Sequence, residues 1–186
     1  ANAIRQAANN SDTVVIIGGG YIGLEVAASL RKKGMKVTVI EAAERILARV
    51  ASEPLADRLT KLHEDNGVEV LTGVGVDSIN AEAGIFESVT LTSGEKIVGD
   101  MLITGIGVFP DSTLAANAGI ETQRKDGGAI LVDEAMRTSE KDVFAVGDVA
   151  LRRDQLLAVE SVHNAQETAA VAAAAVTGST APTIQT

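Results

Sequence analysis

The segment VVIIGGGYIGLEVAASL, residues 14–30, sets a cluster of glycines between a run of β-branched residues and an alanine-rich stretch. The β-branched run is typical of a short buried strand. After the glycines, Ile22, Val26 and Leu30 are spaced four apart, which predicts a helix. A second β-branched run at 36–41 predicts the next strand. The sequence therefore indicates a strand–helix–strand unit with glycines at its first turn.

The glycines follow the pattern G-x-G-x-x-G, at positions 18, 20 and 23. The first would allow the tight turn from strand to helix, the second would let the backbone approach a pyrophosphate, and the third would let the helix pack on the strand. Unpaired N–H groups and the positive end of the helix dipole favour an anion there. A purely structural glycine turn remains the alternative. The predicted dinucleotide-binding residues are Gly18, Gly19, Gly20, Tyr21, Ile22 and Gly23.

Glu41 closes the second strand, 23 residues after Gly18. An acid near this spacing is expected to accept a hydrogen bond from the adenosine ribose and to repel a 2′-phosphate. The two residues that follow it are alanines rather than arginines, which favours NAD(H) over NADP(H). Arg45 and Arg49 lie close enough in sequence to keep NADP(H) open. The other interpretation of Glu41 is a solvated acid at a strand end.

The rest of the chain completes an α/β pattern. A helix beginning near Ser52 is expected to bury Leu55, Leu59 and Leu62, with His63 at the surface. Further expected elements are strands at 68–71 and 101–104, an antiparallel meander over 74–98, a helix near 114–118, strands at 129–132 and 143–146, and a helix over 161–176. The predicted fold is a Rossmann-like three-layer domain with a β-meander insertion, followed by a second region.

Composition excludes several functions. A formal charge of −9 and only 2% aromatic residues argue against a nucleic-acid partner. The sequence contains no cysteine, so it holds no disulfide, thiolate metal site or cysteine nucleophile.

No stretch approaches the roughly 20 apolar residues of a membrane span, and residues 1–12 do not resemble a signal peptide. A cytoplasmic location without a membrane partner is the expectation.

Three later stretches carry a family resemblance: GIGVFPD at 105–111, VFAVGDVA at 143–150 and ESVHNAQETAAVAAAA at 160–175. With the glycine motif, they resemble NADH-dependent, FAD-containing ferredoxin reductases of the putidaredoxin and rhodocoxin reductase type. The resemblance implies an NAD(H)-binding domain at 1–110 and the second part of an FAD-binding domain at 111–186. It also implies that the first FAD part and a C-terminal interface domain lie outside this chain, which alone is expected to be inactive.

The same resemblance implies further site residues. The additional cofactor-binding residues are Gly105, Ile106, Gly107, Asp148, Glu160, Ser161 and Val162. Asp148 matches an aspartate that accepts from a ribityl hydroxyl of FAD, and an ordinary turn aspartate is the alternative. The helix that opens at Ser161 would direct its N-terminus toward flavin N1 and O2, although Ser161 could equally be only an N-cap.

Glu25 and Tyr21 would lie near the nicotinamide. Glu25 matches a family glutamate that pairs with a lysine outside this chain and is the candidate catalytic residue. A carboxylate on the inner side of the helix would be costly unless it is paired, so a structural role competes with the functional one. Tyr21 corresponds to a residue between nicotinamide and flavin, either as a gate or as a simple cover.

The implied function of the intact protein is hydride transfer from NADH to FAD, followed by single-electron transfer to a ferredoxin-type iron–sulfur protein. Several alternatives remain open at the level of the sequence. They are an NADH oxidase or nitrite-reductase-like flavoprotein, a disulfide reductase whose cysteines lie outside this chain, and a non-catalytic NAD-binding module of the apoptosis-inducing type.

Overall fold

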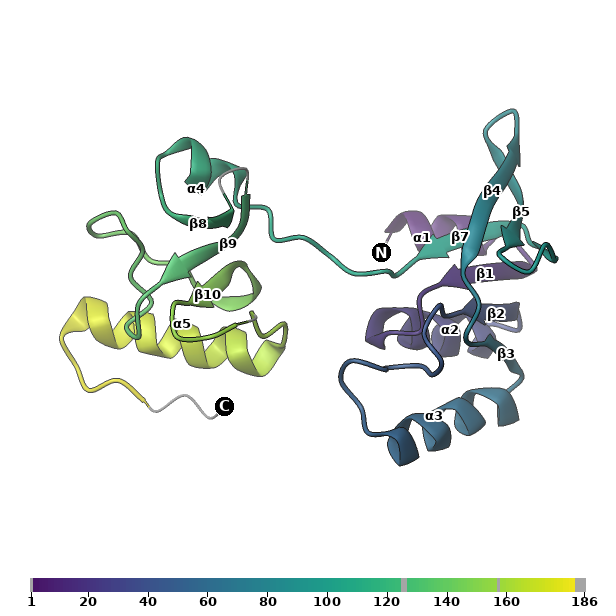
Figure 1. Ribbon diagram of the computed structural model, residues 1–186, viewed down its shortest axis with the longest axis horizontal. Helices are drawn as coiled ribbons and strands as arrows, with labels where there is room; N and C mark the ends of the chain where they lie inside the picture. The colour runs from purple at the N-terminus through teal and green to yellow at the C-terminus, as the bar shows by residue number, and fades with distance from the viewer. Residues whose placement is uncertain (1, 125–126, 157, 183–186) are drawn as a thin grey trace. The chain divides into compact units, whose positions relative to one another are not determined.

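The structure, a computed structural model, describes residues 2–124, 127–156 and 158–182. The chain divides into two compact units, residues 1–107 and residues 108–186 (Figure 1). Each unit has its own sheet and its own buried cluster of apolar side chains. The functions predicted for the two parts of the chain, NAD binding and FAD binding, stay predictions at this point.

The first unit is built on a parallel sheet with the strand order β3-β2-β1-β7 (Figure 1). Its strands are β1 Thr13–Ile17, β2 Lys36–Ile40, β3 Val68–Leu71 and β7 Met101–Thr104. Helix α2, Tyr21–Lys32, connects β1 to β2, and helix α3, Glu53–Asp65, connects β2 to β3. The register places Val14 of the central strand between Val37 and Met101. The Rossmann-like α/β prediction is confirmed.

Alternate residues of β1 face two different layers. Val14 and Ile16 belong to a buried cluster with Ala27 and Leu30 of α2, and helix α1, Asn2–Ala8, adds partly buried apolar side chains to it. Val15 points to the other face, where it packs with residues of β5. That face is covered by the predicted meander of β4 Val76–Glu82, β5 Ile85–Leu91 and β6 Lys96–Val98. The helix α1 was not predicted.

The helix predicted after the glycines is confirmed as α2, whose buried residues are Gly23, Leu24, Ala27 and Leu30, while Ile22 is exposed. The buried face predicted for the next helix was wrong in detail. In α3 only Ala56 is fully buried, whereas Leu55 and Leu62 are 49% and 55% exposed. The reason is that α3 lies at the β3 end of the sheet (Figure 1), where only one narrow face of the helix meets the core.

Asp100 fixes the start of the central strand. Its carboxylate oxygen accepts from the backbone N–H of Asp12 and of Thr13, each at 2.9 Å, and from the Thr13 hydroxyl at 2.8 Å. These hydrogen bonds hold the pKa of Asp100 below its ordinary value. The carboxylate thus ties the segment before β7 to the beginning of β1.

The second unit contains a three-stranded sheet with the order β10-β9-β8. Its elements are α4 Thr113–Asn117, β8 Thr122–Arg124, β9 Gly127–Val132, the 3₁₀ turn η1 Gly147–Val149, β10 Ala150–Arg152 and α5 Val162–Thr177. The core lies between this sheet and α5, with Val132, Met136, Ala145, Ala150, Val171 and Ala172 buried. Gly178 closes α5 in the left-handed conformation.

The strand predicted at 143–146 was wrong. Within it, Phe144 forms only a single antiparallel bridge with Arg137. Met136 and Asp142 both adopt left-handed backbone conformations, with φ of 63° and 62°, which interrupt extended pairing on either side of the bridge. The strand that joins β9 is β10, a short run that the sequence pattern did not single out.

Candidate functional site

Gly18 and Gly23 are required by close packing at the end of β1. Gly18 has φ +108°, and a Cβ built on it would lie 2.5 Å from the Gly105 carbonyl oxygen. A Cβ on Gly23 would lie 2.0 Å from the carbonyl oxygen of Gly18. No side chain fits at either distance, so these two glycines serve the turn and the contact between helix and loop.

Gly20 has no such structural reason to be glycine. It has φ −82°, a value that any residue adopts, and a Cβ built on it would meet no atom within 4 Å. The first backbone bond of α2 runs from Leu24 N–H to Gly20 O. Among the described residues, the N–H groups of Tyr21 and Ile22 have no hydrogen-bond acceptor. The open space therefore adjoins free donors at a helix N-terminus, an arrangement suited to an anion.

The structure brings Glu41 to the glycine loop. Its Oε2 accepts from Gly19 N–H at 2.6 Å, and its Oε1 accepts from Ala43 N–H at 2.8 Å. The side chain is half-buried. Each oxygen is held by one backbone donor and keeps lone-pair capacity for another. The carboxylate is thus fixed in orientation beside the loop, and it is not a freely solvated acid at a strand end.

The connection from β2 to α3 also contacts the glycine loop, which sequence reasoning missed. Leu47 donates its N–H to Gly19 O at 2.9 Å. Ile46 and Leu47 are both buried, in a cluster with Leu24 of α2 and Ala56 of α3. Alanines and a valine surround these two residues in the connection, so no local signal marked them.

The end of β7 meets the same loop. Gly105 donates its N–H to Ile17 O at 2.7 Å, and a Cβ on Gly105 would lie 3.4 Å from Gly23 N. Ile106 is 74% exposed. Gly107 has φ +118° with open space around it. Of these three predicted residues, the structure therefore brings Gly105 against the glycine loop.

Tyr21 and Glu25 lie in the first part of α2, and both are exposed. Glu25 has no ion-pair partner among the described residues. The expectation that Glu25 would lie on an inner side of the helix was wrong, because the inner face of this turn is formed by Gly23 and Leu24. The cost of an unpaired buried carboxylate does not arise here.

In the second unit, Asp148 is exposed on the turn η1. The preceding Gly147 has φ +71°, and its N–H donates to Thr168 Oγ1 of α5 at 3.0 Å. Thr168 Oγ1 in turn donates to Asn164 O at 2.6 Å. The turn that presents Asp148 is therefore fastened to the helix. Thr168 was missed by sequence reasoning; a lone threonine on the buried face of an alanine-rich helix was its only signal.

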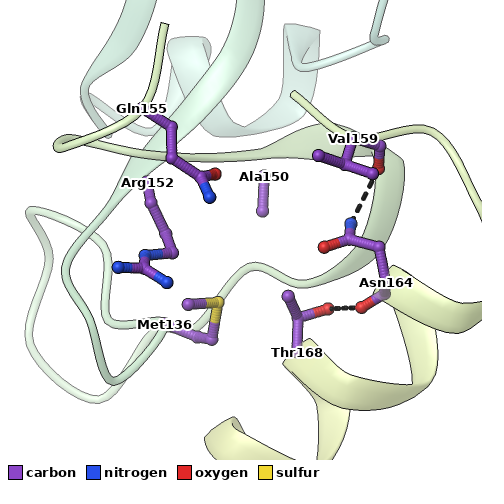
Figure 2. Close-up of a pocket in the computed structure, with 7 residues that line it drawn as sticks. All are labelled: Met136, Ala150, Arg152, Gln155, Val159, Asn164 and Thr168. Carbon is purple, nitrogen blue, oxygen red and sulfur yellow. Dashed lines mark hydrogen bonds between the residues drawn. The ribbon is translucent and has the colours of Figure 1, made fainter. Parts of the chain in front are cut away.

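Ser161 is the N-cap of α5, since its Oγ accepts from Asn164 N–H at 3.1 Å. Asn164 Nδ2 donates to Val159 O at 2.7 Å and so fixes the segment before the helix (Figure 2). The neighbouring Glu160 and Val162 are both exposed. The structural role weighed for Ser161 is confirmed, and its hydroxyl is engaged in the cap.

Figure 2 shows a small cavity beside the start of α5. It is lined by Met136, Ala150, Arg152, Gln155, Val159, Asn164 and Thr168. Its volume of about 10 Å³ leaves room for no more than one water molecule. Arg152, on its rim, is paired with Asp154. The cavity is a feature of local packing and is too small to hold part of a cofactor.

A larger groove lies between α2 and α3. Its volume is about 450 Å³, and its lining residues are Ala28, Arg31, Lys32, Leu62, His63, Asn66 and Val68. His63 is half-buried in it, and this burial lowers the pKa of its imidazole. His63 thus lies at the surface, as expected, with its imidazole partly buried in the groove.

Neither a metal site nor a membrane-spanning helix is present in the part of the chain that the structure describes. No group of histidine, aspartate and glutamate side chains there could hold a metal ion. No helix in the same residues is long and apolar enough to cross a bilayer.

The chain is similar to known oxidoreductases. The family model described as pyridine nucleotide-disulphide oxidoreductase matches residues 1–169. A probable ferredoxin reductase from Castellaniella defragrans is 40% identical over 98% of this chain, and rhodocoxin reductase from Rhodococcus erythropolis is 40% identical over 96% of it. A crystal structure of a ferredoxin reductase from Rhodopseudomonas palustris superposes on 99% of the chain with a TM-score of 0.89 and 35% identity.

The chain spans less than half the length of these relatives. It covers 45% of the Castellaniella protein, 42% of rhodocoxin reductase and 45% of the Rhodopseudomonas chain. The matches include both compact units, since they extend over nearly all of the chain.

Proposed function

This chain belongs to the pyridine nucleotide-disulphide oxidoreductase family, and on that premise we propose that it is the NADH-binding part, with an adjoining part of the FAD site, of a flavoprotein reductase. The whole protein would pass electrons from NADH through FAD to a ferredoxin-type iron–sulfur protein. One arrangement carries the NADH assignment: no protein atom lies near the position of a Cβ on Gly20, and the carboxylate of Glu41 accepts a hydrogen bond from the N–H of the adjacent Gly19.

The first unit would hold the pyrophosphate at the start of α2. The space beside Gly20 would let the phosphates approach the backbone, and the N–H groups of Tyr21 and Ile22 would donate to them. The positive end of the dipole of this 12-residue helix would add to the attraction. No basic side chain is required for this mode of binding.

Glu41 would select the nucleotide. Each of its carboxylate oxygens already accepts one backbone N–H, and each can accept a further hydrogen bond from a ribose hydroxyl. Because the carboxylate is held in place by Gly19 and Ala43, it cannot swing away from a 2′-phosphate without losing both bonds. The charge repulsion with that phosphate would therefore favour NADH over NADPH.

The second unit would supply part of the flavin site. The exposed carboxylate of Asp148, on a turn fastened to α5, suits a chain of hydroxyl groups such as the ribityl portion of FAD. Val162 and Glu160 lie beside the N-terminus of α5, whose dipole favours negative charge. When bound, FAD supplies hydride acceptance and the release of single electrons.

The remaining predicted residues have supporting roles in this proposal. Tyr21, exposed in the first turn of α2, would cover the nicotinamide end of the nucleotide site. Glu25, one turn further, would offer its carboxylate to a cation from outside the described residues. Relatives named as ferredoxin reductase and rhodocoxin reductase support an iron–sulfur protein as the electron acceptor.

Calorimetric titration with NADH and NADPH tests the nucleotide assignment. The chain is expected to bind NADH more tightly, and Glu41→Ala is expected to weaken NADH binding by about 1.5 to 3 kcal/mol, the range for a hydrogen bond to a charged group. Glu44→Ala is the matched control, since it removes an exposed carboxylate of equal charge that does not contact Gly19. Equal affinities for both nucleotides in the wild type would reject the assignment.

A further inference from the structure

We infer that Arg45 is a positioning residue of the nucleotide site, which holds the connection after β2 against the glycine loop, and that it is not a ligand for a 2′-phosphate. This inference rests on the proposed function of the first unit. Arg45 and Arg49 are the two arginines of the connection between β2 and α3.

The guanidinium of Arg45 binds two carbonyl groups of its own connection. Its Nη1 donates to Ala51 O at 2.8 Å, and its Nη2 donates to Ala48 O at 3.1 Å. The side chain is half-buried. A planar guanidinium with two donors in a fixed geometry is suited to bridging two acceptors in this way. Arg45 thus closes the segment 45–51 into a compact turn.

This turn carries the residue that contacts the glycine loop. Leu47 lies inside it and donates its N–H to Gly19 O at 2.9 Å. Leu47 has φ +51°, a left-handed conformation that is unfavourable for a leucine. Such a conformation persists only where surrounding contacts enforce it. The enforcing contacts are the burial of Leu47 and its neighbour Ile46, together with the bridge made by Arg45.

Gly19 is consequently held on both sides of the loop. Its N–H donates to Glu41 and its C=O accepts from Leu47. The position of the Gly19 peptide decides where the carboxylate of Glu41 stands and where the backbone of Gly20 begins. Arg45 therefore acts on the nucleotide through Leu47 and Gly19, without touching it.

The same contacts argue against Arg45 as a phosphate ligand. To bind a 2′-phosphate, it would have to break its bonds to Ala48 O and Ala51 O, and the partly buried Ala51 carbonyl would lose its donor, which is costly. Arg49, in contrast, is exposed and makes no hydrogen bond or ion pair with the described residues. Of the two arginines, only Arg49 is available to a phosphate.

The test compares Arg45→Met, Arg45→Lys and Arg49→Met by titration with NADH and NADPH, each variant made in the wild type and in the Glu41→Ala background. Arg45→Met is expected to weaken both nucleotides by a common factor of about two to thirty, the range for indirect effects on a site, so their affinity ratio stays constant. The affinities of Arg45→Lys should lie between those of the wild type and of Arg45→Met, because an ammonium group keeps the charge and lacks the bridging geometry of a guanidinium. Arg49→Met should leave NADH binding unchanged.

Amide hydrogen exchange supplies a readout that does not depend on the nucleotide. In Arg45→Met the amide of Leu47 should exchange faster, while the amide of Ile16 in the central strand keeps its protection. Selective loss of NADPH affinity in Arg45→Met would make Arg45 a phosphate ligand and overturn the inference. Unchanged affinities with unchanged Leu47 exchange would also overturn it. If the wild type bound neither nucleotide, the proposed function would fail, and Leu47 exchange would still decide the positioning role.

Discussion

Replacing Gly20 should separate nucleotide binding from folding. A Cβ at this position meets no protein atom within 4 Å, and φ of −82° suits any residue. Gly20→Val should therefore reach the wild-type fold, and in Gly20→Ala the gain of about 0.4 to 1 kcal/mol from the lower chain entropy of the unfolded state is offset by the loss of glycine at the N-cap of α2. In both, the new side chain occupies the space through which a pyrophosphate reaches the backbone.

The expected loss of affinity follows from the donors that become unreachable. Tyr21 and Ile22 each offer one N–H to the phosphates. Two hydrogen bonds to a charged group, at about 1.5 to 3 kcal/mol each, total about 3 to 6 kcal/mol, which is more than a hundredfold in the dissociation constant. Gly20→Val should show this full loss, and Gly20→Ala a smaller one.

Gly23→Ala is the matched control, because a Cβ on Gly23 would clash with protein atoms whereas a Cβ on Gly20 meets none. Its Cβ would lie 2.0 Å from Gly18 O, so loop and helix must move apart. Overpacking lowers the free energy of unfolding by about 1 to 3 kcal/mol, and a contact this short belongs at the upper end of that range. Replacing a glycine within a helix returns about 1 kcal/mol, so a net loss of stability is expected. Circular dichroism should show lower thermal stability for Gly23→Ala and not for Gly20→Val. A folded Gly20→Val with wild-type NADH affinity would refute the reasoning.

Three further predictions concern stability. The pKa of Asp100 is lowered, so the ionised carboxylate contributes fully to stability above pH 3.8, the ordinary pKa of an aspartate, and this stability is lost as the pH falls below that value. Asp100→Asn should flatten this dependence of stability on acid pH in denaturant titrations. The pKa of His63 is also lowered, so the wild type should lose stability as the pH falls below about 6.5, and His63→Gln should remove that loss. Thr168→Val leaves the buried Gly147 N–H unpaired and should cost about 1 to 3 kcal/mol in thermal unfolding, whereas Thr168→Ser should retain most of the stability.

Much of the first unit could be predicted from the sequence because its signals are local. The β-branched runs that form β1 and β2 and the spacing of the glycines each report on a few neighbouring residues. Glu41 was placed at the nucleotide site by its position at a strand end, and its bond to Gly19 agrees with that placement. The antiparallel meander predicted over 74–98 was readable for the same reason.

The features that could not be predicted depend on contacts between distant residues. The contact of Leu47 with Gly19 joins two connections of the sheet, and nothing in the residues around Leu47 indicates it. The exposure of Leu55 follows from the place of α3 at a sheet edge, although its spacing is that of a buried face. The run that contains Phe144 has the composition of a strand, yet left-handed residues on either side limit it to one bridge.

The most direct test of the central claim is a titration of the chain with NADH, followed residue by residue through backbone amide chemical shifts. The proposed site predicts saturable changes at Gly20, Tyr21 and Ile22, together with Gly19 and Glu41, whose carboxylate and amide are linked. The amides of Ala129 and Val132 in strand β9, which are buried, should stay unchanged. Saturable shifts confined to residues 108–156, or no saturable shift at any amide of the glycine loop, would contradict the account.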